Sequence, residues 1–295
     1  MPPLRCRSLV ALLIVLGCAR TGTPVPRVFT ETHGEVALAG TRVGPARGSL
    51  VVVGGGQVVP EIVRRFLELA GGRDAPIVVI PTAGGEPDSA YGPHCSCANL
   101  FRKAGATQVT VLHTYDRRVA NSEDFVRAIR EARAVWFPGG RQSRLADTYL
   151  GTRTERELRA LLARGGVIGG SSAGASIQAS FLIRGAPEGN TAVMSPGHEE
   201  GFGFLRNVAV DQHVLVRNRL NDLPKVLERF PGLLGIGIDE RTAIVVQGDR
   251  FEVVGRSRAF VYGGNDQPDP GKPFLTLRNG DRYDMAARRL VARGS

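Results

Sequence analysis

"GGVIGGSSAGASIQAS", residues 165 to 180, places two serines between glycines directly after an apolar run. The apolar run ending at Ile168 indicates a buried strand, and the small residues of 173–180 indicate the start of a helix. The turn Gly170 to Gly174 fits the pattern G-x-S-x-G, in which glycines are needed because a Cβ atom would clash. Ser172 is therefore a candidate nucleophile; the alternative is a glycine-rich turn that only packs a helix onto a strand.

Apolar runs alternate with amphipathic segments on the N-terminal side of this turn. The expected strands lie in 48–56, 75–85, 108–115, 134–140 and 167–172, and the expected helices in 60–72, 96–106, 122–132 and 153–166. This alternation predicts an α/β fold with a mostly parallel sheet covered by helices on both faces. Sites in such sheets lie beyond the carboxyl ends of the strands. Ser172 and the turn Gly139-Gly140 are therefore expected at one edge of the sheet.

A second group of polar residues follows a short predicted strand in "VAVDQHVLVRNRLNDL", residues 208 to 223. A serine hydroxyl is a weak nucleophile unless a neighbouring base takes its proton. His213 is the natural candidate for that base because its strand is predicted to end at the same edge as Ser172. The alternative is a buried histidine that is bonded only to backbone.

The N-terminus has the pattern of an export signal. Two arginines precede "SLVALLIVLGCA", a basic start and an apolar stretch too short for a membrane span. The stretch ends in Val-Leu-Gly-Cys18, similar to a bacterial lipobox in which the cysteine is lipidated, although plain cleavage near Ala19 stays open. We expect a signal peptide over 1–18, a tether over 19–47, and an exported protein in the periplasm, on the outer membrane as a lipoprotein, or outside the cell.

Composition restricts the partners. The chain has 38 basic and 28 acidic residues and a formal charge of +10, which favours anionic partners. The arginines are scattered and no nucleic-acid motif is present, so nucleic acid is not an expected partner. Cys95 and Cys97 with His94 lack the second cluster that a zinc site needs, so no metal is expected. A disulfide across one residue would be strained, which favours two separate thiols at the start of a helix, with oxidation in an extracytoplasmic compartment as the alternative.

Four segments together resemble the cyanophycinase branch of the dipeptidase E serine peptidase family. They are "FPGGRQSRL" (137–145), "GGSSAGAS" (169–176), "DQHVLVRNR" (211–219) and "GIGIDERTAIVV" (235–246). The resemblance covers residues 48 to 262 and implies a class I glutamine amidotransferase-like, three-layer sandwich. It also implies no cofactor and a homodimer. We place the peptidase domain at 48–265 and expect 266–295 to be a peripheral segment.

The resemblance also assigns catalytic roles. Ser172 corresponds to the nucleophile and His213 to the base. The family has a glutamate in the loop after the nucleophile helix, where Glu188 is the nearest carboxylate and Asn190 an alternative. The oxyanion donors would be the Ala173 amide and an amide of Gly139 or Gly140.

The family's substrate-binding positions correspond to Gln142, Asp211, Gln212, Arg217 and Arg219. A carboxylate such as Asp211 can hold a guanidinium in a planar two-bond geometry, and arginines suit substrate carboxylates. Surface arginines at a helix start are the alternative for the last two. The chain departs from the family in two places. Asp222 stands where a basic residue is usual, and Arg141 stands where an aspartate is common.

The resemblance implies a serine exopeptidase that hydrolyses β-aspartyl peptides and releases β-Asp-Arg dipeptides from cyanophycin, a poly-aspartate that carries arginine. The altered charges at positions 222 and 141 affect the expected identity of the substrate more than the expectation of serine hydrolysis. An aspartyl dipeptidase with the same site is one alternative. A lipoprotein that binds amino-acid-like ligands without catalysis is another, although the intact Ser172 and His213 count against it.

Overall fold

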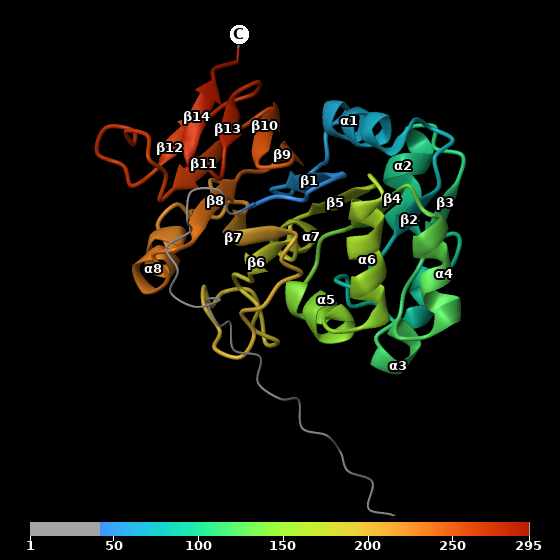
Figure 1. The fold of residues 1–295 in the computed structure, drawn as a ribbon. Helices are drawn as coiled ribbons and strands as arrows, with labels where there is room; N and C mark the ends of the chain where they lie inside the picture. Colours follow the sequence, from blue (N-terminus) through green and yellow to red (C-terminus); the bar gives the residue numbers. More distant parts are fainter. Residues whose placement is uncertain (1–41, 295) are drawn as a thin grey trace, which may run out of the picture.

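The computed structural model describes residues 42–294, whose strands form two sheets (Figure 1). The main sheet has nine strands in the order β14-β13-β10-β9-β1-β5-β4-β2-β3, and the second has five in the order β12-β11-β8-β7-β6. The strands are β1 (Ser49–Val53), β2 (Ile77–Val79), β3 (Val109–Val111), β4 (Ala134–Phe137), β5 (Val167–Ser171), β6 (Ala179–Phe181), β7 (Leu205–Gln212), β8 (Leu234–Ile238), β9 (Thr242–Gln247), β10 (Arg250–Gly255), β11 (Ala259–Tyr262), β12 (Leu275–Leu277), β13 (Arg282–Asp284) and β14 (Arg289–Ala292).

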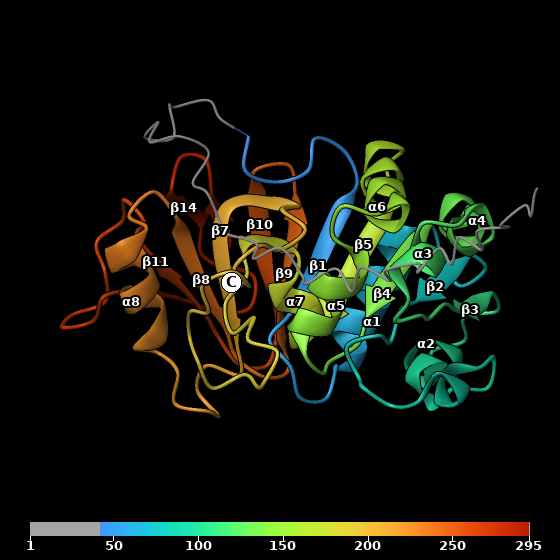
Figure 2. The same ribbon diagram turned by 90° about the horizontal axis from the view of Figure 1, so that it is seen from below.

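Helices cover both faces of the main sheet. The helices of residues 42–294 are α1 (Pro60–Ala70), α2 (Asn99–Lys103), α3 (Arg117–Ala120), α4 (Glu123–Glu131), α5 (Gln142–Tyr149), α6 (Arg153–Ala163), α7 (Ala173–Ser176) and α8 (Asp222–Arg229), with 3-10 turns η1 (Asp88–Tyr91) and η2 (Ser96–Ala98). Figure 2 shows α1 and α2 on one side of the central strands and α3, α4 and α6 on the other. The expected sandwich is thereby confirmed.

The central strands are buried on both faces, which explains their continuous apolar runs. Strands β1, β5, β4, β2 and β3 are all parallel. Along β1, Val51 and Val53 face the cluster beneath α1, and Leu50 and Val52 face the opposite cluster. Alternate residues of a strand point to opposite faces, so the four positions from Leu50 to Val53 must all be apolar.

Helix ends follow their sequence signals. Pro60 opens α1, and Gly71 ends it in the left-handed conformation, with φ of 105°. The Ser122 hydroxyl accepts a hydrogen bond from the Phe125 amide at 3.2 Å and caps α4. The boundaries expected for both helices are confirmed to within a few residues.

The second sheet packs against the face of the main sheet that carries α4 and α6, and α8 covers its outer side (Figure 1). The segment after residue 265 adds an edge strand, β12, to this sheet, and adds β13 and β14 to the edge of the main sheet. Its Tyr283 and Met285 are buried in the shared core. The expected division at residue 265 stays a prediction.

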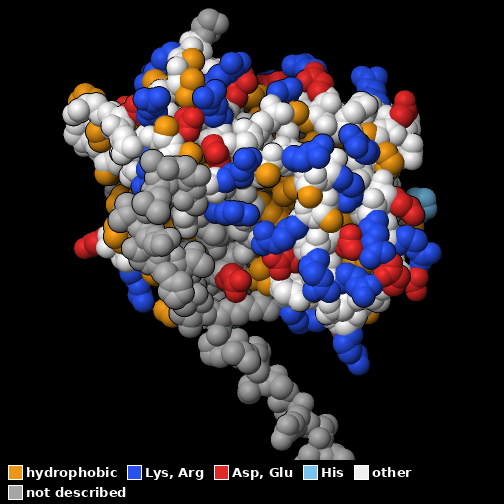
Figure 3. All heavy atoms as spheres, viewed as in Figure 1, with side chains coloured by type: hydrophobic (Ala, Val, Ile, Leu, Met, Phe, Trp, Pro, Cys, Tyr) orange, Lys and Arg blue, Asp and Glu red, His pale blue; other side chains and the backbone are white. Residues whose placement is uncertain are grey.

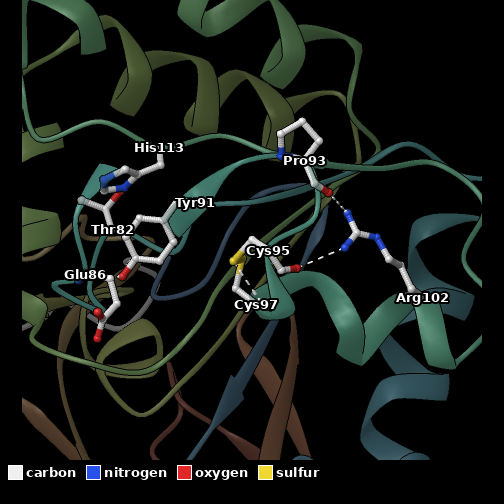
Figure 4. The surroundings of a disulfide bond; sticks show 8 residues. All are labelled: Thr82, Glu86, Tyr91, Pro93, Cys95, Cys97, Arg102 and His113. Carbon is white, nitrogen blue, oxygen red and sulfur yellow. Dashed lines mark hydrogen bonds between the residues drawn. A yellow bond between two sulfur atoms is a disulfide. The ribbon is translucent and has the colours of Figure 1, made fainter. Parts of the chain in front are cut away.

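Cys95 and Cys97 are joined by a disulfide (Figure 4), so the preference for two separate thiols is wrong and the oxidised alternative is the one observed. Their Cα atoms lie 5.2 Å apart, inside the usual range for bridged cysteines. The Arg102 guanidinium donates to the Pro93 and Cys95 carbonyl oxygens and holds the loop against α2. The turn at η2 therefore brings the two cysteines close enough to pair.

Basic side chains are spread over the face seen in Figure 3, with acidic ones among them, in line with the scattered arginines of the sequence. Within residues 42–294, no helix is long and apolar enough to cross a membrane. The expected signal peptide, the tether to residue 41 and the lipidation site Cys18 lie outside the described residues.

Candidate active site

Ser172 occupies the sharp turn between β5 and α7. Its backbone has φ of 57° and ψ of −111°, a conformation that few non-glycine residues adopt. A Cβ atom on Gly170 would lie 2.3 Å from the Gly174 carbonyl oxygen, and one on Gly174 would lie 2.0 Å from the Phe137 oxygen. The glycines of G-x-S-x-G are therefore required by close backbone approach. The turn holds the Ser172 side chain at the carboxyl edge of the sheet, as the sequence predicts.

His213 lies opposite Ser172, directly after β7. The His213 Nε2 atom is 2.8 Å from the Ser172 Oγ atom. His213 also has a positive φ, of 56°, and its amide donates to the Gly54 carbonyl oxygen at 2.9 Å. A Cβ atom on Gly55 would lie 2.2 Å from the imidazole, so only glycine leaves room for the ring. The structure thus brings together the serine and histidine that the sequence pairs.

The carboxylate beside His213 is Glu240, in the turn after β8. Its Oε1 atom lies 2.6 Å from His213 Nδ1. Glu188, which the family resemblance suggests as the third catalytic residue, is exposed in the loop after β6, and the alternative Asn190 lies in the same loop. The expectation for Glu188 is corrected, because the carboxylate that meets the ring comes from a different segment. Glu240 lies in the quoted segment "GIGIDERTAIVV", directly after the short apolar run Ile236 to Ile238, which is the signal that could have identified it.

The environment of His213 favours a neutral ring. Burial lowers the pKa of His213, the hydrogen bond that the ring donates to Glu240 opposes that effect, and the charge of Arg217 lowers the pKa further. The net direction is below the ordinary value of 6.5. A neutral imidazole at neutral pH can accept the Ser172 proton, which is the property that a general base needs.

Asp239 holds the turn that carries His213. Its Oδ1 atom accepts the amides of Leu215 at 3.1 Å and Val216 at 3.3 Å, and Ser257 Oγ donates to its Oδ2 atom at 2.6 Å. Asp239 is 5% exposed. Asp239 therefore fixes the backbone after His213, and the next residue, Glu240, fixes the imidazole ring. Neither residue is among those that the sequence predicts for the site.

Candidate oxyanion donors surround the serine. Ala173 is the first residue of α7, so its amide has no carbonyl partner within that helix. A Cβ atom on Gly139 would lie 3.3 Å from Ser172 Cβ, so the Gly139 backbone is beside the nucleophile. Gly140 packs against Ala83, whose carbonyl oxygen also accepts the Arg141 amide. Of the two glycines named in the sequence, Gly139 is the one adjacent to Ser172.

Four of the five predicted substrate residues are buried and bonded: Gln142, Asp211, Gln212 and Arg219. The Gln142 Nε2 atom donates to the Ile183 carbonyl oxygen at 2.8 Å, and its Oε1 atom has no partner among the described residues. The Gln212 Oε1 atom accepts from Arg219 Nη1 at 2.7 Å. Burial and the charges of neighbouring arginines lower the pKa of Arg219 to about 10. Arg217 is exposed, and no ion pair of it occurs within residues 42–294.

Asp211 is not open to a substrate cation, contrary to expectation. It is fully buried, and its two oxygens accept from Arg184 Nε and Nη2, each at 3.1 Å. Arg184 also donates from Nη2 to Asp222 Oδ2 at 2.6 Å. Arg184 was not identified from the sequence, because nothing in "FLIRGAPEG" marks it as a partner of a residue 27 positions away. The unusual acid Asp222 thus has an internal partner.

Within the described part of the chain, no group of three His, Cys, Asp or Glu side chains could hold a metal ion. The chemistry that the described side chains offer is that of a hydroxyl, an imidazole and a carboxylate in a row, beside backbone amides. Such a row can transfer an acyl group through the serine.

Comparisons with known proteins agree with this geometry. Residues 50–254 match Peptidase family S51. A cyanophycinase of Geminocystis herdmanii is 34% identical over 83% of this chain and 97% of its own length, and a cyanophycinase of Nostoc sp. is 30% identical over 78% of this chain and 82% of its own. The crystal structure of a peptidase from an acI-B1 actinobacterium superposes with a TM-score of 0.63, at 25% identity, over 82% of this chain and 97% of that one.

Proposed function

We propose that this chain, which belongs to peptidase family S51 and is a serine-type peptidase, hydrolyses β-aspartyl peptides of the cyanophycin type through an acyl-enzyme on Ser172. The observation that carries the mechanism is the row of hydrogen bonds from Ser172 Oγ to His213 Nε2, 2.8 Å, and from His213 Nδ1 to Glu240 Oε1, 2.6 Å. A base and an orienting carboxylate in this order are what an unreactive hydroxyl requires.

In the proposed reaction, Ser172 Oγ attacks the carbonyl carbon of the scissile bond while its proton moves to His213 Nε2. The Nδ1–H group donates to Glu240, which fixes the tautomer and stabilises the imidazolium. Collapse of the tetrahedral intermediate breaks the C–N bond, and His213 returns the proton to the leaving amine. Water then attacks the acyl-enzyme with His213 again as base, releasing the acid and restoring the Ser172 hydroxyl.

The negative charge on the tetrahedral oxygen would be held by backbone amides. Ala173 at the start of α7 and Gly139 after β4 flank the nucleophile. Loss of one such donor typically lowers kcat by roughly a hundred- to a thousandfold. Fixed amides need no rearrangement as the charge develops, and this supports their assignment as the oxyanion site.

The substrate class rests on the relatives named cyanophycinase and on Arg217, an exposed cation one turn beyond the base. Arg217 suits a substrate carboxylate. The test is incubation of the purified protein with cyanophycin and with α- and β-aspartyl dipeptides, followed by mass spectrometry, with Ser172→Ala as the matched control. We expect dipeptides from cyanophycin with the active protein alone. Cyanophycin left intact by the active protein would contradict the proposal.

An aspartyl dipeptidase with the same site is the second candidate. It is favoured by the internal pairing of Asp211 with Arg184, because that carboxylate is not free to bind an arginyl side chain of a polymer. The same panel separates the two functions. Cleavage of free dipeptides with cyanophycin left intact would favour the dipeptidase.

Export, lipid anchoring and a homodimer are further proposals, supported by the pattern ending at Cys18 and by the family resemblance. A thioether-linked lipid supplies most of such an anchor, so Cys18→Ser is expected to move the protein from the membrane fraction to the soluble one. Wild-type protein already free in the soluble extracytoplasmic fraction would instead indicate plain secretion. Sedimentation equilibrium of the purified chain measures its oligomeric state.

A further inference from the structure

A polar cavity lies outside the catalytic row, beside strands β11 to β14. Its volume is about 610 Å³, which is within the range of ligand sites in proteins. The charged residues that line it are Arg258, Asp269, Arg278, Asp281 and Arg293. All of them follow residue 254, where the match to Peptidase family S51 ends. The cavity therefore belongs to a part of the chain to which the family match assigns no role.

The cavity lies at the same edge of the structure as the catalytic row. Arg258 precedes β11, whose first residue pairs with Ile238, the last residue of β8. Arg278 follows β12, whose last residue pairs with that same first residue of β11. Glu240 follows β8 by two residues, so it leaves the sheet at this edge as well. Neighbouring strands are about 4.8 Å apart, so β11 starts roughly 10 Å from the end of β7, which His213 follows.

Hydrogen bonds join the segment before β11 to the turn that carries Glu240. The Asp239 amide donates to the Arg258 carbonyl oxygen at 3.1 Å, and Ser257 Oγ donates to the Asp239 carboxylate at 2.6 Å. The Ser257 amide in turn donates to the Thr242 hydroxyl at 2.8 Å. The backbone of Arg258 is thereby held at a fixed place beside the catalytic row. A ligand in the cavity would consequently have a defined position relative to the nucleophile.

The cavity offers charges of both signs that have no ion pair within the protein. Arg258 and Arg278 are exposed, and neither has an ion pair among residues 42–294. Asp269 is half-buried and has no ion pair in that range either, and its Oδ2 atom accepts a backbone amide at 3.2 Å. Arg293 and Asp281 are paired with each other at 2.8 Å. Two guanidinium groups and one carboxylate are therefore left for a ligand.

This set of charges matches a ligand that bears a carboxylate and a cation. An arginine linked to a chain through its α-amine keeps both its α-carboxylate and its guanidinium, and each unit of cyanophycin carries one such arginine. Arg258 and Arg278 suit the carboxylate because a guanidinium donates two parallel hydrogen bonds to it, and Asp269 suits the guanidinium for the same reason. A simple anion would leave the Asp269 carboxylate unpaired beside it.

We propose that this cavity is an exosite, a substrate-binding site outside the catalytic pocket, which holds an arginyl branch of the polymer several units away from the scissile bond. The inference rests on the proposed function and adds a second contact site to it. An extended chain advances about 3.3–3.6 Å per residue, so the gap of roughly 10 Å corresponds to about three units. A segment of two units is too short to fill both sites, whereas a segment of eight units can fill both.

The experiment measures kcat and KM for cyanophycin segments of two and of eight units in wild type, in Arg258→Ala/Arg278→Ala and in Arg289→Ala. Arg289 is the matched control because it is exposed and starts β14, at the opposite end of that strand from the cavity. In the double variant, KM for the eight-unit segment rises by roughly tenfold or more with kcat unchanged, because the lost contacts bind substrate and transition state equally. KM for the two-unit segment stays within about twofold of wild type, and the control matches wild type on both segments.

Two results would overturn the inference. One is an unchanged KM of the double variant for the eight-unit segment. The other is an equal rise in KM for both lengths, which would show that the two arginines act on the catalytic pocket and not on a distant unit.

Failure of the proposed function is distinguishable from failure of the exosite. If wild type cleaves neither segment, the proposed function fails, and calorimetric binding of the eight-unit segment to Ser172→Ala tests the cavity alone. Weaker binding after Arg258→Ala/Arg278→Ala is added to that variant supports the exosite. Equal affinity of the two proteins, or no binding by either, overturns it.

Discussion

Asp211 and His213 lie two residues apart at the end of β7, yet their surroundings differ in kind. One ring nitrogen of His213 is hydrogen-bonded to Glu240, and the other is hydrogen-bonded to the reactive hydroxyl of Ser172. Asp211 has both oxygens bonded to a buried arginine. The arrangement around His213 leaves a proton free to move, whereas the arrangement around Asp211 leaves no oxygen free to bind another group. Residues of one sequence motif can therefore serve chemistry and internal structure side by side.

The largest expected effect is on Ser172. Ser172→Ala removes the atom that forms the acyl bond, and kcat is expected to fall by about 10⁶-fold, as in other serine hydrolases that lose the nucleophile. Ser171→Ala is the matched control, because Ser171 is the last residue of β5 and is not bonded to His213 in the structure. Steady-state hydrolysis and fluorophosphonate labelling measure both. An active Ser172→Ala with an inactive Ser171→Ala would show that the nucleophile is Ser171, one residue earlier in the turn.

The second largest effect on kcat is expected at Glu240. Glu240→Gln keeps the size of the side chain but favours the wrong tautomer of His213, and kcat is expected to fall by up to roughly 10⁴-fold with little change in KM. Glu188→Gln removes an exposed carboxylate and should leave kcat unchanged. Initial rates on a β-aspartyl dipeptide decide between them. Loss of activity in Glu188→Gln alone would restore the assignment made from the sequence.

Asp211 is expected to affect stability. Asp211→Ala leaves Arg184 buried with an incomplete partner set, and the free energy of unfolding should fall by about 3–5 kcal/mol. Lys225→Ala breaks a pair in which the lysine is largely exposed, and should cost at most about 1 kcal/mol. Urea unfolding followed by circular dichroism gives both values. Equal stability of Asp211→Ala and wild type would show that Asp211 is not a structural partner of Arg184.

The smallest effect concerns pH. Burial and the charge of Arg217 lower the pKa of His213, and activity requires the neutral ring, so the acidic limb of kcat/KM should lie below pH 6.5. Arg217→Ala removes a charge that lowers this pKa, so the limb should move to higher pH. Glu240→Gln removes a partner that raises it, so the residual activity should show a limb at lower pH. Shifts in the same direction for both variants would contradict this account of His213.

The sequence determined the fold and two members of the catalytic row. Apolar runs alternating with amphipathic helices are sufficient to predict a parallel sheet, because burial on both faces demands them. The glycines at 170 and 174 mark the turn of Ser172 through the absence of a Cβ atom, a requirement that is local in the chain. His213 follows from its place after a strand that ends at the same edge.

Only the tertiary structure decided which carboxylate meets His213 and which cation meets Asp211. Strand β8 pairs in parallel with β7, with Gln212 opposite Ile238, so the residues after both strands meet at one edge and Glu240 reaches the ring. Arg184 reaches Asp211 from the segment after β6, the neighbour on the other side of β7. Partner choice depends on strand order and register across the sheet, which local sequence patterns do not specify.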